Sequence, residues 1–260
     1  MEQAPLQFIK LDTSGHVARM TLNRPPYNAL SIPMMIEITK AIEGLHDARE
    51  CRCIVIEAAP ECKDFCAGVA MQDATAQRAF QMVEAFQGIF NAMLEISKPV
   101  ITVVNGRAIG AGCELALFGD MVVATEKAIF AQPEIRQGIF PPIAAIILPH
   151  LVGPKRALEM ILMGEPIKPQ EAFRLGLVNR LVTEANLRAE VDTLVARIAD
   201  QSSAVLEMAK HAIFKTIGLP LPEAMKISAD IYLNQLMDLE DAQEGLLAAA
   251  EKRKPVWKNK

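Results

Sequence analysis

Short apolar strands alternate with helices through residues 53–182, and this alternation constrains the fold more than any other feature. The segment CIVIE at 53–57 has a buried-strand pattern, and PVITVV at 99–104 has another. Between them, residues 76–95 place large apolar side chains at helical spacing. Strands joined by helices pair in parallel through right-handed crossovers. The pattern therefore predicts an α/β layered core.

The two ends of the chain differ from this middle part. Residues 8–22 alternate in a way that predicts a β-hairpin, and Ser31 is a plausible N-cap for the helix that follows. From residue 184 onward the periodicity is helical. We therefore predict a core domain at 1–185 that holds the ligand site and a helical C-terminal region at 186–260.

The composition excludes several classes of protein. A chain of 260 residues with 51% hydrophobic residues can bury a large core, which excludes disorder. The net charge of −4 gives no general attraction for nucleic acid, so we expect no nucleic-acid partner. No apolar run reaches the roughly 18 residues of a membrane span, and no signal-type segment is visible at the N-terminus. The five cysteines lack paired metal-binding spacing, so we expect reduced thiols, no metal site and a cytoplasmic location.

A turn of small residues, Gly110-Ala111-Gly112, precedes an apolar helix. Small residues let the backbone approach a ligand closely, and the unpaired N–H groups at a helix start attract an anion. Glu114 lies in the first turn of this helix among apolar neighbours. Two interpretations stay open for this segment alone: Glu114 takes part in acid–base chemistry, or it complements the helix dipole.

The sequence contains a second acid in an apolar setting and a second turn of small residues. Glu134 stands after Pro133 in IFAQPEIRQGIF, where it either caps the next helix or forms an acid–base pair with Glu114. Two carboxyl groups in apolar surroundings can be tuned to neutral pH and can share one water molecule. The turn at 66–68 (CAG) adds backbone donors, and two turns converging on one oxygen form an oxyanion hole in which each donor contributes roughly 3 kcal/mol.

These segments resemble the signature segments of the crotonase superfamily, the enoyl-CoA hydratases and isomerases. The similarity covers nearly the whole chain in the family order: NRPPYNALS at 23–31, CAG at 66–68, KPVITVVNGRAIGAGCELAL at 98–117, AQPEIRQGIFP at 131–141 and EGLLAAAEKRKP at 244–255. The resemblance implies a crotonase-like spiral of ββα units with a helical C-terminal trimerisation region. It also implies a homotrimer, or a homohexamer built as a dimer of trimers.

Matched by position, the resemblance implies that the N–H groups of Val69 and Ala111 hold the thioester oxygen. Glu114 and Glu134 match the two glutamates with which hydratases hold water and deliver its hydroxyl and proton, whereas isomerases usually keep only the later one. The implied reaction is hydration of an α,β-unsaturated acyl-CoA, which is the substrate, and no cofactor is implied. The implied substrate contacts are Arg24, Ala67, Gly68, Met71, Gly110, Pro142 and Lys252, with Arg24 and either Lys252 or Lys254 as phosphate contacts.

Departures from the family pattern leave the acyl group open. Residues 141–145 read PPIAA where the family is usually glycine-rich, which adds side-chain bulk and restricts the backbone. This version is similar to that of hydratases acting on cyclohexa-1,5-diene-1-carbonyl-CoA. We therefore keep two acyl groups open, this cyclic dienoyl group and a short linear enoyl group.

Three other functions are weighed against hydration. Within the family, the alternative is a Δ3-Δ2 enoyl-CoA isomerase or another enolate-forming enzyme. A dinucleotide-dependent dehydrogenase is disfavoured because the glycines at 106, 110 and 112 do not have the G-x-G-x-x-G spacing. RNA binding is disfavoured because the chain lacks a basic, aromatic-rich stripe.

Overall fold

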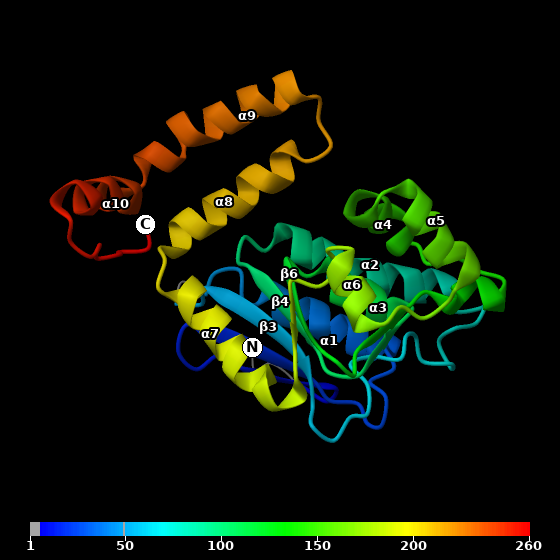
Figure 1. Cartoon of the computed structure of the whole chain (residues 1–260). Coiled ribbons are helices and arrows are strands. Elements are labelled where there is room, and N and C mark those ends of the chain that lie inside the picture. The colour runs from blue at the N-terminus through cyan, green and yellow to red at the C-terminus, as the bar shows by residue number, and fades with distance from the viewer. Residues whose placement is uncertain (1–5, 49) are drawn as a thin grey trace.

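The computed structural model describes residues 6–48 and 50–260, and a six-stranded sheet forms its centre (Figure 1). The first two strands of the sheet are antiparallel, as the predicted hairpin requires, and all other neighbours are parallel. This mixed sheet confirms the predicted α/β class. In sheet order the strands are β1 (Ile9–Asp12), β2 (Val17–Leu22), β3 (Cys53–Ala58), β4 (Val100–Val104), β6 (Met121–Thr125) and β8 (Arg180–Val182).

Both faces of the sheet are buried, which explains why its central strands are apolar without alternation. All five residues of β4 are buried. In β3, Ile54 and Ile56 belong to the main hydrophobic core, while Cys53 and Val55 belong to a second core on the opposite face. Each Å² of apolar surface removed from water contributes roughly 25 cal/mol, so burial on both faces holds the sheet between two helical layers.

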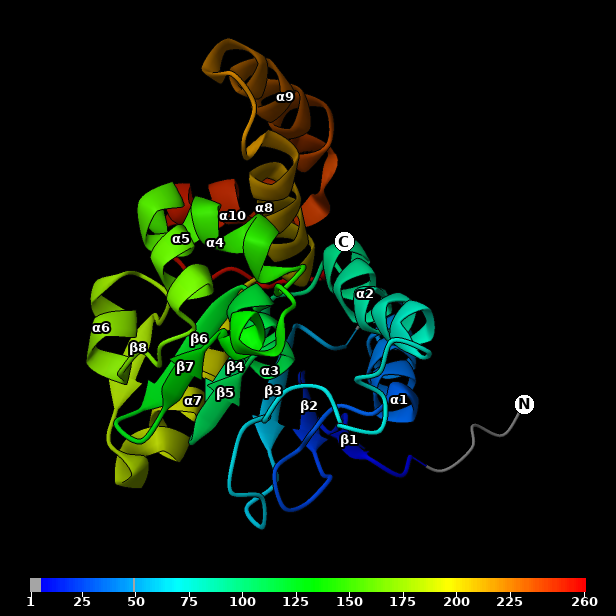
Figure 2. The same cartoon turned by 90° about the vertical axis from the view of Figure 1, so that its right-hand side faces the viewer.

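Helices cover the two faces unequally (Figures 1 and 2). The main core includes side chains of α1 (Ile32–Glu43), α2 (Ala79–Glu95), α3 (Ala111–Phe118), α4 (Ala144–Val152), α5 (Pro154–Met163) and α6 (Pro169–Arg174). On the opposite face, α7 (Leu187–Ala199) packs Val191, Leu194 and Val195 against the sheet. Although α7 lies within the predicted region 186–260, it packs on the layered body, and the division at 185/186 stays a prediction.

The helix starts mostly follow the sequence signals. Ser31 is the N-cap of α1, and its hydroxyl accepts a hydrogen bond from the Met34 N–H, which confirms the predicted cap. The helix predicted from residue 76 begins at Ala79, because residues 75–78 form a turn instead. The apolar helix predicted at Cys113 begins two residues earlier, at Ala111.

A second, two-stranded sheet positions the two acidic segments. Its parallel strands are β5 (Arg107–Ile109) and β7 (Ile129–Ala131). The chain passes from β5 through Gly110 into α3, and from β7 through Gln132 into the 3-10 helix η1 (Pro133–Gln137). Because the carboxyl ends of parallel strands meet at one edge, the first turn of α3 and the first turn of η1 start side by side.

The last helices form an arm that extends from the layered body (Figure 1). The arm consists of α8 (Ser203–Thr216), α9 (Leu221–Asn234), the 3-10 helix η3 (Leu236–Asp238) and α10 (Glu240–Glu251). A further 3-10 turn, η2 (Glu184–Asn186), precedes α7. The helical character predicted from residue 184 onward is confirmed.

Two further expectations concern the chain as a whole. No helix within residues 6–48 and 50–260 is both long and apolar enough to span a membrane. All five cysteines are free in the structure, and four of them are buried: Cys51, Cys53, Cys66 and Cys113.

Candidate active site

A cavity of about 440 Å³ lies where the two small-residue turns approach η1. Its wall is formed by the loop at 67–79, by residues 109–111 and by the segment 133–139. The predicted site residues that line it are Ala67, Gly68, Val69, Met71, Gly110, Ala111 and Glu134. Residues from three distant parts of the sequence therefore share one cavity.

Val69 lines this cavity, and its N–H is directed away from Leu30 because of how its neighbours are bonded. Leu30 forms a parallel bridge with Val69, in which the Leu30 N–H donates to the Gly68 carbonyl and the Ala70 N–H donates to the Leu30 carbonyl, both at 2.8 Å. In a parallel bridge the central residue directs its own N–H and C=O away from its partner. Within the described chain, the Val69 N–H has no hydrogen-bond acceptor.

The Ala111 N–H is the second donor, at the first residue of α3. The Gly110 N–H is bonded to the Ala131 carbonyl at 2.8 Å, whereas the Ala111 N–H finds no acceptor in the part of the chain that the structure describes. Gly68 lies close to it, since a Cβ placed on Gly68 would be 4.0 Å from the Ala111 nitrogen. The two predicted donors thus lie on adjacent turns, at the positive end of a helix dipole.

Tight backbone packing brings the two turns together. The Cys66 N–H donates to the Arg107 carbonyl at 3.1 Å, and the Ile109 N–H donates to the Cys66 carbonyl at 2.9 Å. Gly112 packs against the same carbonyl so closely that a Cβ there would lie 2.2 Å from the Cys66 oxygen. Only glycine permits this approach, so Gly112 fixes the separation of the two donors.

Glu134 lies in the first turn of η1 with its carboxylate over Gly110. A Cβ on Gly110 would lie 2.3 Å from Glu134 Oε1, and Gly110 has a positive φ of 54°. Among the buried side-chain atoms of the described residues, Glu134 Oε2 is one of six without a hydrogen-bond partner. Burial raises the pKa of Glu134, which a hydrogen bond to its own backbone partly offsets. The carboxyl is therefore held against the small turn, with one buried oxygen that has no partner among the described residues.

Glu114 lies behind this position, in the first turn of α3, and is only 1% exposed. Its Oε1 accepts hydrogen bonds from the N–H groups of Ile143 and Ala144, each at 2.7 Å. Burial raises the pKa of Glu114 to about 7; the Ala144 N–H opposes this shift and the nearby Glu134 carboxyl adds to it. Two neighbouring carboxyl groups whose pKa values are both raised by burial can act as an acid–base pair.

Three predicted contacts lie outside the lining of this cavity. The guanidinium of Arg24 donates to the Ala29 carbonyl at 2.9 Å and so stabilises its own turn. Pro142 does not line the cavity and precedes Ile143 and Ala144, whose N–H groups donate to Glu114. Lys252 ends α10 on the arm, in a left-handed conformation with a φ of 55°. The structure therefore does not bring Arg24 and Lys252 to the cavity.

Several lining residues carry no signal in the sequence. The loop before α2 contributes Ala74, Thr75 and Ala76, and α2 itself contributes Ala79 and Met82. On the opposite wall, Gln137 and Ile139 follow Glu134. These residues have ordinary types for a loop or a helix face, and only the tertiary fold shows that they meet.

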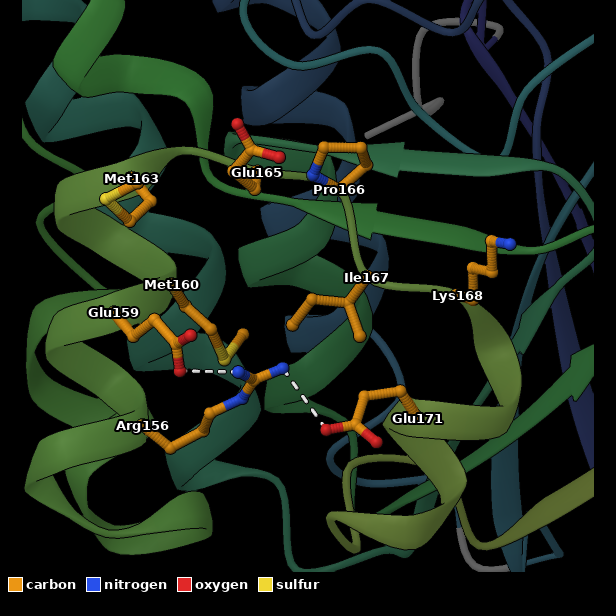
Figure 3. A pocket seen from close by; sticks show the side chains of 9 residues that line it. All are labelled: Arg156, Glu159, Met160, Met163, Glu165, Pro166, Ile167, Lys168 and Glu171. Carbon is orange, nitrogen blue, oxygen red and sulfur yellow. Dashed lines mark hydrogen bonds and ion pairs between the residues drawn. The ribbon is translucent and has the colours of Figure 1, made fainter.

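A second cavity, of about 480 Å³, lies between α5 and α6 (Figure 3). Its main charged side chain is Arg156, which forms ion pairs with Glu159 and, at 3.2 Å, with Glu171. The Arg156–Glu171 pair joins the two helices, whereas the Arg156–Glu159 pair lies within α5. This cavity is separate from the two acids and the two N–H donors. We assign it no chemistry.

Comparison with known proteins agrees with this arrangement. The chain belongs to the enoyl-CoA hydratase/isomerase family, whose model matches residues 12–260. The crystal structure of an enoyl-CoA hydratase from Mycobacterium smegmatis superposes with a TM-score of 0.91 at 31% identity, covering 97% of this chain and 99% of that one. The expected crotonase-type fold is thereby confirmed.

Two curated relatives have more specific names. A crotonyl-CoA hydratase of Syntrophomonas wolfei is 34% identical over 95% of this chain and 96% of its own length. A carnitinyl-CoA dehydratase of Escherichia coli is also 34% identical, over 98% of this chain and 99% of its own length. Both names describe addition or removal of water at an acyl-CoA, but the acyl groups differ.

Proposed function

We propose that the protein is a hydro-lyase that adds water across the double bond of an α,β-unsaturated acyl-CoA. The observation that carries this proposal is that Glu134 lines one cavity together with two N–H groups that have no acceptor among the described residues, and that the buried Glu114 carboxyl lies near Glu134, behind the cavity wall. The family membership supports the reaction class. Retention of both glutamates favours hydration over isomerisation, for which one carboxyl group suffices.

The geometry supports a balanced addition of water. One carboxylate accepts a proton from a water molecule while the oxygen of that water bonds to the β-carbon. The electrons of the double bond move onto the thioester oxygen. The N–H groups of Val69 and Ala111 stabilise this enolate oxygen. The other carboxyl, protonated because its pKa is raised, donates a proton to the α-carbon. The pair begins and ends with one proton, so only water is consumed.

The proposal is tested by hydration of crotonyl-CoA, followed by the loss of enoyl absorbance. We expect Glu134→Gln to lower kcat by at least roughly 10³-fold while circular dichroism stays unchanged, because the amide cannot transfer the proton. Full activity of this variant would contradict the mechanism. If Glu114→Gln also loses turnover, both acids are required, whereas an isomerase would keep its activity in that variant.

Two acyl groups remain candidates, and one assay separates them. The relative named crotonyl-CoA hydratase favours a short linear enoyl group. The cyclic dienoyl group is favoured by the segment 141–145, whose sequence PPIAA is similar to that of hydratases acting on this group. Comparing kcat/KM for crotonyl-CoA and cyclohexa-1,5-diene-1-carbonyl-CoA decides between them.

For the CoA phosphates, Lys63 replaces Arg24 as our candidate contact. Lys63 is exposed and lies 5.8 Å from the centre of the half-exposed Tyr27 ring. The Tyr27 carbonyl accepts the Ala67 N–H at 3.0 Å, so this aromatic and cationic surface adjoins the cavity wall. An aromatic face beside a cation suits adenine and phosphate groups.

We also propose that the chain assembles as a homotrimer or as a dimer of trimers. The arm supports this proposal because it exposes large apolar side chains, including Phe214, Leu221, Tyr232 and Leu233. Apolar surface of this kind marks interaction sites in folded proteins.

A further inference from the structure

The loop that carries Val69 is fixed by an acid that the proposed chemistry does not use. Asp73 is 1% exposed and lies four residues after Val69. Its Oδ2 accepts a hydrogen bond from the Ile32 N–H at 3.0 Å, and its Oδ1 pairs with the guanidinium of Arg78. A buried carboxylate costs free energy unless it is paired and hydrogen-bonded, and here it has a partner for each oxygen.

Asp73 supplies a second capping acceptor at the start of α1, in addition to Ser31. The first turn of α1 contains no acid, and Pro33 has no N–H to offer. Ser31 satisfies the Met34 N–H, which leaves the Ile32 N–H for a partner elsewhere in the chain. Asp73 fills this role from 41 positions away and places a negative charge at the positive end of the α1 dipole.

The same contact completes a series of bonds on both sides of Val69. The Leu30 N–H donates to the Gly68 carbonyl before Val69, and the Ala70 N–H donates to the Leu30 carbonyl after it. The Asp73 N–H then donates to the Ala70 carbonyl at 2.8 Å, and the Asp73 carboxylate returns to α1. The segment 68–73 is thus attached to 30–32 at its beginning, its middle and its end.

We infer that Asp73 is a positioning residue that holds the Val69 N–H in its place in the oxyanion hole. The inference rests on the hydration proposed above, because it matters only if Val69 polarises a thioester. Without Asp73, the end of the loop is free to move, while the Ala111 donor stays fixed by Gly112. Misplacing one reacting group by about 1 Å can lower the rate by roughly 100-fold.

The test compares Asp73→Ala with Ser31→Ala, a matched control. Both substitutions remove one side-chain acceptor from the start of α1, but only Asp73 belongs to the loop. We expect Ser31→Ala to keep kcat within about twofold. We expect Asp73→Ala to lower kcat for crotonyl-CoA by roughly 10- to 100-fold, with a smaller change in KM. Asp73→Asn keeps one acceptor oxygen and is expected to fall between wild type and Asp73→Ala.

A second measurement reports on the Val69 N–H donor directly. Hydrogen bonds to the thioester oxygen polarise a bound hexadienoyl-CoA and shift its absorption to longer wavelength. We expect this shift to decrease in the order wild type and Ser31→Ala, then Asp73→Asn, then Asp73→Ala. If Asp73→Ala does not fold, Asp73→Asn carries the test.

The outcomes separate the inference from the function on which it rests. An active wild type together with unchanged kcat and absorption shift in Asp73→Asn would overturn the positioning role. If kcat and the absorption shift decrease no more in Asp73→Ala than in Ser31→Ala, the positioning role is overturned as well. A wild type that hydrates no enoyl-CoA would instead overturn the proposed function.

Discussion

Glu114 shows how one residue can be set by competing local effects. Its burial disfavours the ionised carboxylate, and the neighbouring Glu134 adds repulsion. The N–H groups of Ile143 and Ala144 oppose both effects, yet the pKa remains raised to about 7. A carboxyl group with this pKa exchanges its proton near the pH at which most enzymes work. The same environment makes Glu114 costly to the fold when it is ionised.

This cost gives a prediction about the pH dependence of stability. The pKa of Glu114 is about 7 when folded, against 4.5 ordinarily, so the folded state binds the proton more tightly. This tighter proton binding by Glu114 contributes on the order of 3 kcal/mol to the free energy of unfolding. The contribution is fully present below pH 4.5 and is lost as the pH rises toward 7. We therefore expect Glu114→Gln to be more stable than wild type at about pH 8 and no more stable at about pH 4.5.

Urea unfolding at the two pH values measures this difference. Glu84→Gln, at an exposed position of α2, is the control and is expected to change the free energy of unfolding by less than about 0.5 kcal/mol. A Glu114→Gln variant that is less stable than wild type at the higher pH would show that the two N–H bonds outweigh burial.

At the scale of elements, the sequence predicts what depends on local pattern. Hydrophobic periodicity predicts the strands and helices, and the cap preference predicts the start of α1 at Ser31. The sequence does not predict β5, because three residues followed by a glycine match the pattern of a turn. Nor does it predict the acceptor role of Asp73 or the donors at Ile143 and Ala144, which depend on contacts between distant segments. The two acids stand out in the sequence by their apolar neighbours, and the family resemblance supplies the two N–H donors. The wall formed by Thr75, Met82 and Gln137 is visible only in the tertiary structure.

The attachment of α8 to the sheet also depends on contacts between segments that are far apart in the sequence. Lys210 Nζ, buried at the inner face of α8, donates to the Lys98 carbonyl at 2.9 Å and to Asp120 Oδ2 at 2.7 Å. Asp120 also accepts the Val100 N–H at 2.6 Å, at the first residue of β4. This largely buried ion pair links the arm to the edge of the layered body.

We expect Lys210→Met to lower the free energy of unfolding by about 2–4 kcal/mol, because it leaves the Asp120 carboxylate without its cation. The control is Lys215→Met in the last turn of the same helix, where the side chain is exposed and the effect should stay below about 0.5 kcal/mol. Urea denaturation of both variants checks this. Equal effects would mean that the pair does not anchor the arm.

At the scale of the whole molecule, the arm exposes apolar surface that a single chain leaves in water. An apolar cavity of about 580 Å³ lies between α8 and the body, with Ile147, Leu151, Ile213 and Phe214 in its lining. Farther along the arm, Leu221, Met225, Tyr232 and Leu233 are more than half exposed. Burying one such side chain contributes roughly 1.5–3 kcal/mol, so covering several of them would stabilise an assembly strongly.

The proposed assembly gives the last prediction, measured as the molar mass in solution by light scattering. We expect wild type to elute with three or six times the chain mass of 28.5 kDa. Leu233→Asp places a charge at a position that is 63% exposed in one chain, where it should cost that chain less than about 0.5 kcal/mol. If Leu233 is buried between subunits, the same charge must be desolvated, so the variant should dissociate. Leu94→Asp, on α2 outside the arm, should keep the wild-type mass, and a monomeric wild type would contradict the proposed assembly.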